Sequence, residues 1–222
     1  MLRSPLQNYY RFIMAPEKKA PVDWPEFKRF LELLGRGDPD HKIVISIFPD
    51  DDGKPNIHIP CLAGSIPTPR INSLLARNQG LSLGLVINPS LPQPDYWGKE
   101  PDHFNRNGEL RVWGASNLHI AGARWIWYEA DGGLPHEEQL AAISRAGLPE
   151  PDLIIDTGGK SLHCYWRLDE QITPEQFRDL QQRLQQSIDA LTPEMGGDQG
   201  IHNPCRVMRA PGGQHPKTGR RC

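Results

Sequence analysis

The sequence lacks any continuous run of about 20 apolar residues, which is the length that a membrane-spanning helix needs. Its mean hydropathy is −0.57. Residues 1–6 (MLRSPL) contain no apolar stretch of the kind that a secretory signal carries. We therefore expect neither a membrane span nor a membrane partner.

Cysteine is scarce, and none of the four cysteines belongs to a CxxC pair. This excludes a small disulfide-stapled scaffold and favours a reduced, cytoplasmic protein. An excess of one charge is missing too, since the net charge is −2. A globally basic nucleic-acid binder is thereby excluded, although a locally basic groove is compatible with this balance.

Proline and glycine are abundant, with 22 and 21 residues of 222, which argues against a helix bundle. Hydrophobic spacing predicts a helix over residues 24–34 and strands over 42–48, 56–62 and 81–88. The aspartates at 50–52 stand beside Gly53 and between prolines, which favours a hairpin turn over a metal site. Residues 89–119 predict a long irregular excursion.

Beyond residue 120 the pattern becomes regular, with strands predicted over 124–131, 152–156 and 161–168 and helices over 136–146 and 174–190. Thr173, Pro174 and Gln176 mark the start of the last helix. This order predicts an α+β fold with helices on one side of a largely antiparallel sheet. We expect an N-terminal α/β module over residues 1–120 and a second module over 121–222.

An acidic pair, Glu129 and Asp131, stands at the end of the predicted strand 124–131. Residues two apart on a strand point the same way, so the carboxylates would lie side by side and repel. A divalent cation removes that repulsion, and a solvated acidic turn is the alternative. Trp125 and Trp127 share this face, where core packing is favoured over stacking on a base.

A glycine turn, Gly158-Gly159, precedes Lys160, Ser161 and His163. It is no Walker A loop, because that motif requires an earlier glycine and a following helix, and a strand follows here. Ser161 and His163 lie on the same face of that strand, where they could donate hydrogen bonds to phosphate oxygens. Lys160 adds a point charge, so the turn is predicted to bind an anion.

The last acidic residue is Asp198, and a basic segment with Arg206, Arg209, Lys217, Arg220 and Arg221 follows it. Such a segment suits polyphosphate or a nucleic-acid backbone, a disordered tail being the alternative. A zinc site drawn from His202, Cys205, His215 and Cys222 is disfavoured because the spacings are irregular.

The order of these clusters, E-x-D, then S-x-H, then a lone Asp followed by R-x-x-R and a basic turn, resembles the archaeo-eukaryotic primase (primase-polymerase) superfamily. Within it, the sequence is similar to the plasmid and phage replication primases. The resemblance covers about residues 80–220 and implies a primase-like core whose second half is RRM-like. The first acid is here a glutamate, Glu129, where the family commonly has aspartate.

The resemblance implies a DNA primase or polymerase that transfers nucleotides from NTPs or dNTPs to a 3′-hydroxyl on a single-stranded DNA template. Glu129, Asp131 and Asp198 would hold two Mg²⁺ or Mn²⁺ ions. The implied nucleotide-binding residues are Lys160, Ser161, His163, Arg206 and Arg209, and the implied DNA-binding residues are Lys217, Arg220 and Arg221.

Two other functions stay open at this stage. One is a non-catalytic DNA-binding module with a degenerate primase fold. The other is a rolling-circle endonuclease, which is disfavoured because residues 56–60 and 118–120 each offer one histidine where two are needed. The abrupt end at residue 222 suggests a fragment of a longer replication protein, with a helicase or a helical primase domain as partner.

Overall fold

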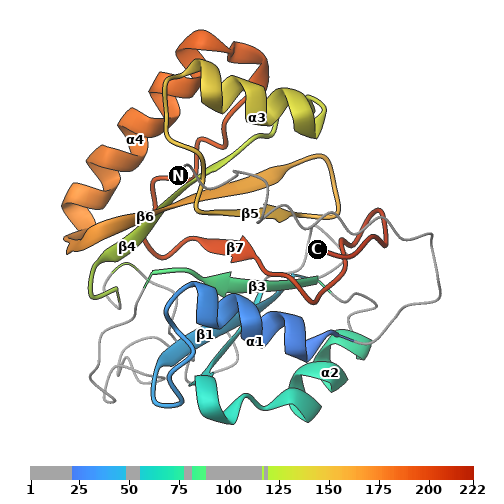
Figure 1. Ribbon diagram of the computed structural model, residues 1–222. Coiled ribbons are helices and arrows are strands. Elements are labelled where there is room, and N and C mark those ends of the chain that lie inside the picture. The colour runs from blue at the N-terminus through green and yellow to red at the C-terminus, as the bar shows by residue number, and fades with distance from the viewer. Residues whose placement is uncertain (1–21, 49–55, 78–81, 89–116, 118–119) are drawn as a thin grey trace, which may run out of the picture.

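The computed structural model describes residues 22–48, 56–77, 82–88, 117 and 120–222. The aspartate turn at 50–52 and, apart from residue 117, the excursion at 89–119 lie outside the described residues. Helices α3 (His136–Arg145) and α4 (Pro174–Leu191) lie above a three-stranded sheet, and α1 (Trp24–Leu33) and α2 (Thr68–Arg77) accompany a four-stranded one (Figure 1). The architecture is α+β, as the sequence predicted.

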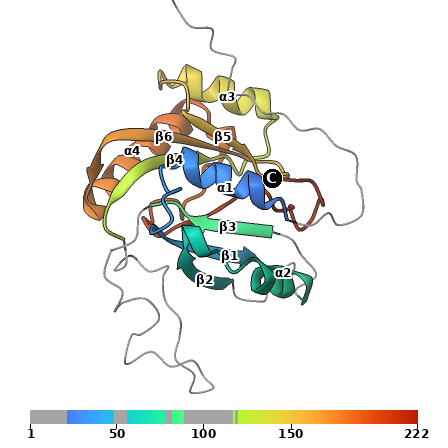
Figure 2. The same cartoon turned by 60° about the horizontal axis from the view of Figure 1, so that its bottom comes forward.

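The four-stranded sheet has the order β2-β1-β3-β7 and is antiparallel throughout. Its strands are β1 (Lys42–Phe48), β2 (Ile57–Leu62), β3 (Ser82–Val86) and β7 (Val207–Arg209). The apolar, β-branched run of β1 is buried between its two neighbours. Figure 2 shows α1 covering one face of this sheet.

Strand β7 was not predicted, because three residues are too few to display a period. It pairs with β3, with Met208 opposite Leu85, and so completes a sheet whose other strands all come from before residue 120. The C-terminal part of the chain therefore contributes to both sheets. The boundary near residue 120 stays a prediction about the modules.

The three-stranded sheet has the order β4-β6-β5 and is also antiparallel. Its strands are β4 (Ala123–Glu129), β5 (Leu153–Asp156) and β6 (Leu162–Ile172). Beyond α4, an isolated bridge joins Gly197 to Ala130 at the free edge of β4. The second half thus follows the βαββαβ order, with a minimal last strand beside the first.

Helix α4 covers the remaining edge of β4. Its capping box, formed by Thr173 and Gln176, is present as predicted. The side chain of Gln181 accepts from the backbone N–H of Trp127 at 3.2 Å and donates to the carbonyl of the same residue. One buried glutamine therefore satisfies both backbone groups of an edge-strand residue.

Both tryptophans of β4 belong to the core, as favoured from the sequence. Trp127 is fully buried, 5.1 Å from Phe177 of α4 between ring centroids, and Trp125 donates to the carbonyl of Leu34 at 3.2 Å. Ser161 and His163, which were predicted to share a strand face and to bind an anion, are buried there together with Tyr165, which packs beside Trp127. Sheet pairing and the apolar neighbours outweigh the polarity of these side chains.

In the part of the chain that the structure describes, no helix is long and apolar enough to cross a membrane.

Candidate functional site

Backbone pairing brings the predicted acidic residues to the edge of β4. The backbone N–H of Asp198 donates to the carbonyl of Glu129 at 3.3 Å, and that of Asp131 donates to Gly196 at 3.2 Å. These bonds flank the Ala130–Gly197 bridge, so Asp198 stands opposite Glu129. Residues opposite each other in an antiparallel pair project to the same face. The backbone therefore places Glu129 and Asp198 on one face.

A glycine permits this close approach. A Cβ built on Gly132 would lie 1.8 Å from the carbonyl oxygen of Glu194, which a side chain cannot do. The N–H of Gly132 donates to Met195 at 2.8 Å and closes the same pairing. The segment that carries Asp198 can therefore reach β4 only because residue 132 has no side chain.

On the other side of Glu129 stands His163 of β6, its partner in the strand register. His163 Nε2 lies 3.1 Å from Glu129 Oε1, and the histidine is 2% exposed. Burial alone would raise the pKa of Glu129, but His163, followed by Arg206 and Arg209, lowers that pKa to about 2. Glu129 is therefore ionised, and His163, Glu129 and Asp198 form a row across neighbouring strands.

The other two acids each have a lysine or an arginine as partner. Arg206 forms an ion pair with Asp198, and the Nζ of Lys160 lies 3.7 Å from Asp131 Oδ1. Lys160 also donates to the backbone carbonyl of Asp131. These contacts distribute positive charge among carboxylates that would otherwise repel one another.

The carboxylates have the chemistry of a divalent-cation site, because hard cations prefer oxygen ligands. Their side chains are nevertheless turned towards His163, Lys160 and Arg206. Among the described residues, no three His, Cys, Asp or Glu side chains are grouped so that they could hold a metal ion. The backbone places the predicted acids together, but the side chains adopt ion pairs in place of a cluster.

The glycine turn before β6 is held by hydrogen bonds with Gln139 of α3. Its Nε2 donates to the carbonyl of Lys160 at 2.7 Å, and its Oε1 accepts from the N–H of Leu162 at 2.9 Å. Ser161, between them, is 5% exposed. Gln139 was not predicted as a site residue; the available indication was its position on the same buried helix face as Ile143.

The C-terminal segment packs over the same turn. Thr218 Oγ1 donates to the carbonyl of Gly158 at 2.6 Å, and Cys222 Sγ donates to that of Thr157 at 3.0 Å. His215 lies against Gly159: a Cβ there would be 2.7 Å from His215 Nε2. The basic segment predicted to bind an anion is therefore next to the turn with the same prediction.

His215 accepts at Nδ1 from the backbone N–H groups of Lys217 and Thr218, at 3.2 and 3.3 Å. Burial first, and then the cations Arg209, Lys217 and Arg220, lower its pKa to about 4. The imidazole is therefore neutral at pH 7. Because Nδ1 accepts, the proton of the neutral ring belongs on Nε2, the atom that faces Gly159.

The remaining predicted basic residues make contacts within the protein. The guanidinium of Arg209 lies 5.6 Å from the ring centroid of Phe48. Arg220 pairs with Asp156 at 3.2 Å and Arg221 with Asp23 at 3.8 Å. These pairs fix the segment on the fold, and the predicted contacts of Lys217, Arg220 and Arg221 with DNA stay predictions.

Comparison with known proteins gave structural matches alone. No family model matches the chain, and no curated protein sequence matches it. The AEP domain of the primase-polymerase (PrimPol) of cyanophage S-2L superposes with a TM-score of 0.63 and 25% sequence identity, covering 91% of this chain and 89% of that one.

The polymerase domain of Mycobacterium tuberculosis ligase D in complex with DNA has 15% identity and a TM-score of 0.47, over 96% and 86% of the two chains. The cyanophage likeness, over nearly the full length of both chains, agrees with the motif order and with the sheet topology. The chain therefore has an archaeo-eukaryotic primase-type fold.

Proposed function

We propose that this protein is a primase-polymerase that joins NTPs or dNTPs to a 3′-hydroxyl on a single-stranded DNA template. The observation that carries the proposal is the backbone pairing that places Glu129, Asp131 and Asp198 along one edge of β4, beside a glycine turn and a basic segment. The likeness to a cyanophage primase-polymerase domain supports it independently.

In this proposal Glu129, Asp131 and Asp198 hold two Mg²⁺ or Mn²⁺ ions. Bound ions would lower the pKa of the attacking hydroxyl and neutralise charge on the triphosphate. Since Asp131 and Asp198 are paired with Lys160 and Arg206 in the observed conformation, these two cations must release their carboxylates as the ions bind. The triphosphate, a stronger anion, is the partner to which they would transfer.

Lys160, Ser161 and His163, with Arg206 and Arg209, are the proposed nucleotide-binding residues. Lys160 is the most accessible of the turn residues, with 59% of its side chain exposed, and so can move to a phosphate. His163 has its Nε2 on Glu129. If His163 also binds a phosphate, its imidazole must contact Glu129 and the nucleotide at the same time.

The second candidate function is a DNA-binding module without catalysis. The ion pairs favour it, because Asp198 and Asp131 are already paired with the protein's own Arg206 and Lys160. The rolling-circle alternative has less support: His58, in β2, is hydrogen-bonded at 2.7 Å to Ser46. Residues 118 and 119 lie outside the described residues.

Incorporation of labelled NTPs and dNTPs on unprimed and primed single-stranded DNA, with Mg²⁺ or Mn²⁺, tests the proposal. Asp131→Ala and Asp198→Ala should each reduce incorporation by about a hundredfold or more, because each removes a metal ligand. Asp179→Ala, which removes an exposed acid of α4 paired with Arg183, is the matched control and should be fully active.

Incorporation by either site variant at the wild-type rate would reject the catalytic assignment. A wild-type protein that binds DNA but incorporates nothing in any of these conditions would establish the non-catalytic module. Circular dichroism and thermal melting of all variants separate lost chemistry from lost folding.

A metal titration tests the exchange of partners directly. Without nucleotide, Arg206→Ala should bind Mn²⁺ about tenfold more tightly than wild type, since its Asp198 no longer has a competing guanidinium. It should bind the triphosphate less tightly. Arg183→Ala, in a surface pair of α4, is the control. Equal Mn²⁺ affinity in wild type and Arg206→Ala would contradict competition by the ion pair.

A further inference from the structure

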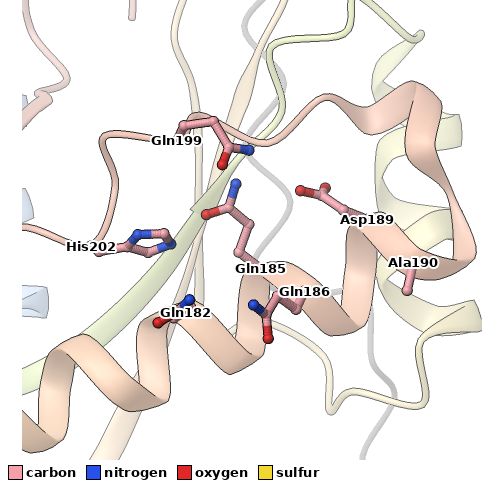
Figure 3. A pocket seen from close by; sticks show the side chains of 7 residues that line it. All are labelled: Gln182, Gln185, Gln186, Asp189, Ala190, Gln199 and His202. Carbon is pink, nitrogen blue, oxygen red and sulfur yellow. The ribbon is translucent and has the colours of Figure 1, made fainter.

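A polar pocket lies beside the loop that carries Asp198. It has a volume of about 420 Å³ and lies between α4 and residues 199–202. Three glutamines of α4, Gln182, Gln185 and Gln186, line it together with Asp189, Gln199 and His202 (Figure 3). The volume falls in the range of small-molecule sites, about 300–1,000 Å³, and far exceeds the ~30 Å³ of a single water.

The floor of the pocket holds a buried polar atom without a partner. Gln185 is 3% exposed, and its Nε2 donates to the carbonyl of Gly197 at 3.1 Å. That bond fixes the amide and turns Oε1 towards His202, as Figure 3 shows. Oε1 has no hydrogen-bond partner among the described residues, and neither has the buried Nε2 of His202. Leaving such atoms unpaired costs about 1–3 kcal/mol each, so the pocket is suited to a polar ligand.

The chemistry of the lining excludes a phosphate. None of the described residues that line the pocket is lysine or arginine. The single acid, Asp189, accepts at Oδ1 from the hydroxyl of Tyr128 at 2.5 Å and from the N–H of Gly197 at 3.3 Å. The rest of the polar lining consists of amides and one imidazole. Such groups donate and accept side by side, which is how glutamine and asparagine recognise the edges of bases.

The pocket is also coupled to the acidic site. Gln185 and Gln199 both donate to the carbonyl of Gly197, each at 3.1 Å, and Gly197 precedes Asp198. A ligand held between Gln185 and His202 would therefore lie next to the segment that pairs with β4.

We propose that the pocket formed by Gln185, Gln199 and His202 binds a nucleobase by its hydrogen-bonding edge, with Gln185 Oε1 accepting from the base and His202 Nε2 completing the pair. The base comes from a single strand or from a free nucleotide, and the chemistry is the same. The inference rests on the proposed function solely for DNA as the source of the base.

The test is side-chain NMR of the full chain without metal. Deoxyadenosine, deoxyguanosine, deoxycytidine and thymidine, which carry no phosphate, are titrated against the amide resonances of Gln185 and Gln199 and the imidazole of His202. Saturable shifts at these groups are expected with at least one nucleoside. His202→Ala should weaken binding about tenfold, whereas Arg183→Ala, outside the pocket, should not change it.

Titrations with two single strands, one ordinary and one abasic, show whether the bound base comes from a DNA strand or from a free nucleotide. A 12-nucleotide single strand that shifts the same resonances more tightly than its nucleosides, while an abasic strand of equal length does not, assigns the pocket to a strand base. Tighter nucleoside binding assigns it to a free nucleotide. Equal shifts with the abasic strand, or no shift with any nucleoside or strand, would overturn the proposal.

The pocket and the catalytic assignment can fail separately. Nucleoside shifts that are the same in Asp131→Ala and in wild type support the pocket whatever the incorporation assay gives. Incorporation by a protein whose pocket resonances never respond would leave the proposed function intact and reject the pocket.

Discussion

His163 of β6 and Glu129 of β4 face each other directly across the sheet, with His163 Nε2 3.1 Å from Glu129 Oε1. The pair is nearly enclosed, since His163 has 3% and Glu129 20% of its side chain exposed. The sequence assigned one residue to phosphate and the other to metal. In the fold their side chains contact each other.

The contact predicts a coupling energy between these two residues. His163→Ala leaves an ionised, largely buried carboxylate without its main partner and should lower the free energy of unfolding by about 1–3 kcal/mol. Glu129→Gln removes the charge, so adding His163→Ala to it should cost less. Urea unfolding of the two single variants and the double variant gives the coupling. Strictly additive losses would contradict the pairing.

We expect substitution of Gln181, a polar residue on α4, to lower the free energy of unfolding strongly. It is fully buried and bonds both backbone groups of Trp127. Gln181→Leu leaves those groups unpaired and should lower the free energy of unfolding by about 2–3 kcal/mol. Gln182→Leu, at the next and exposed position, should change it by less than about 0.5 kcal/mol. Similar losses in the two variants would refute the bridging role.

Alanine substitutions at two neighbouring glycines, Gly132 and Gly133, distinguish displacement of the site from backbone strain. A Cβ at Gly132 would collide with Glu194, whereas Gly133, at φ 84°, has no atom within 4 Å of a Cβ. Gly133→Ala should therefore cost about 1–2 kcal/mol of strain and leave incorporation largely unchanged. Gly132→Ala displaces the segment with Asp198 and should reduce incorporation more than tenfold. Melting temperatures and incorporation rates are measured for both variants. A larger loss of incorporation in Gly133→Ala than in Gly132→Ala would contradict the prediction.

The neutral His215 predicts a pH effect on stability. Its pKa is about 4 in the fold, against about 6.5 in an unfolded chain. Between these values the unfolded chain binds a proton that the folded chain does not, so the stability due to His215 is complete above pH 6.5 and falls towards pH 4.

His215→Asn keeps an acceptor near Nδ1 but cannot take up that proton. The variant should therefore lose less stability than wild type when the pH is lowered from 7 to 5. Urea midpoints at the two pH values measure the difference. An equal loss in both proteins would show that His215 does not titrate in this window.

Local chemistry made much of the fold predictable. The run KIVISIF gives β1 its predicted bounds, Lys42–Phe48, because a β-branched, apolar segment has few other ways to bury itself. The capping box at Thr173 and Gln176 marks the start of α4 for the same reason, since it acts over three residues. Strand β7 escaped prediction because pairing with β3, and not its own pattern, makes it a strand.

The burial of three glutamines was not predicted, for a related reason. Gln139, Gln181 and Gln185 are polar by composition, and a helical pattern assigns polar residues to solvent. Each is buried because a backbone group elsewhere in the chain needs a partner: a glycine turn for Gln139, the edge of β4 for Gln181 and Gly197 for Gln185. No local pattern records where such groups come to lie.

The sequence by itself determined most of the elements, the order of the acidic and basic clusters and the residue types that could serve a cation and a polyphosphate, because these depend on neighbours within a few positions. Tertiary structure alone decided that Asp198 stands opposite Glu129, and that His163, Lys160 and Arg206 hold the three acids. Ion pairing acts through space, so its partners follow from strand register and edge pairing, which distant parts of the chain set together.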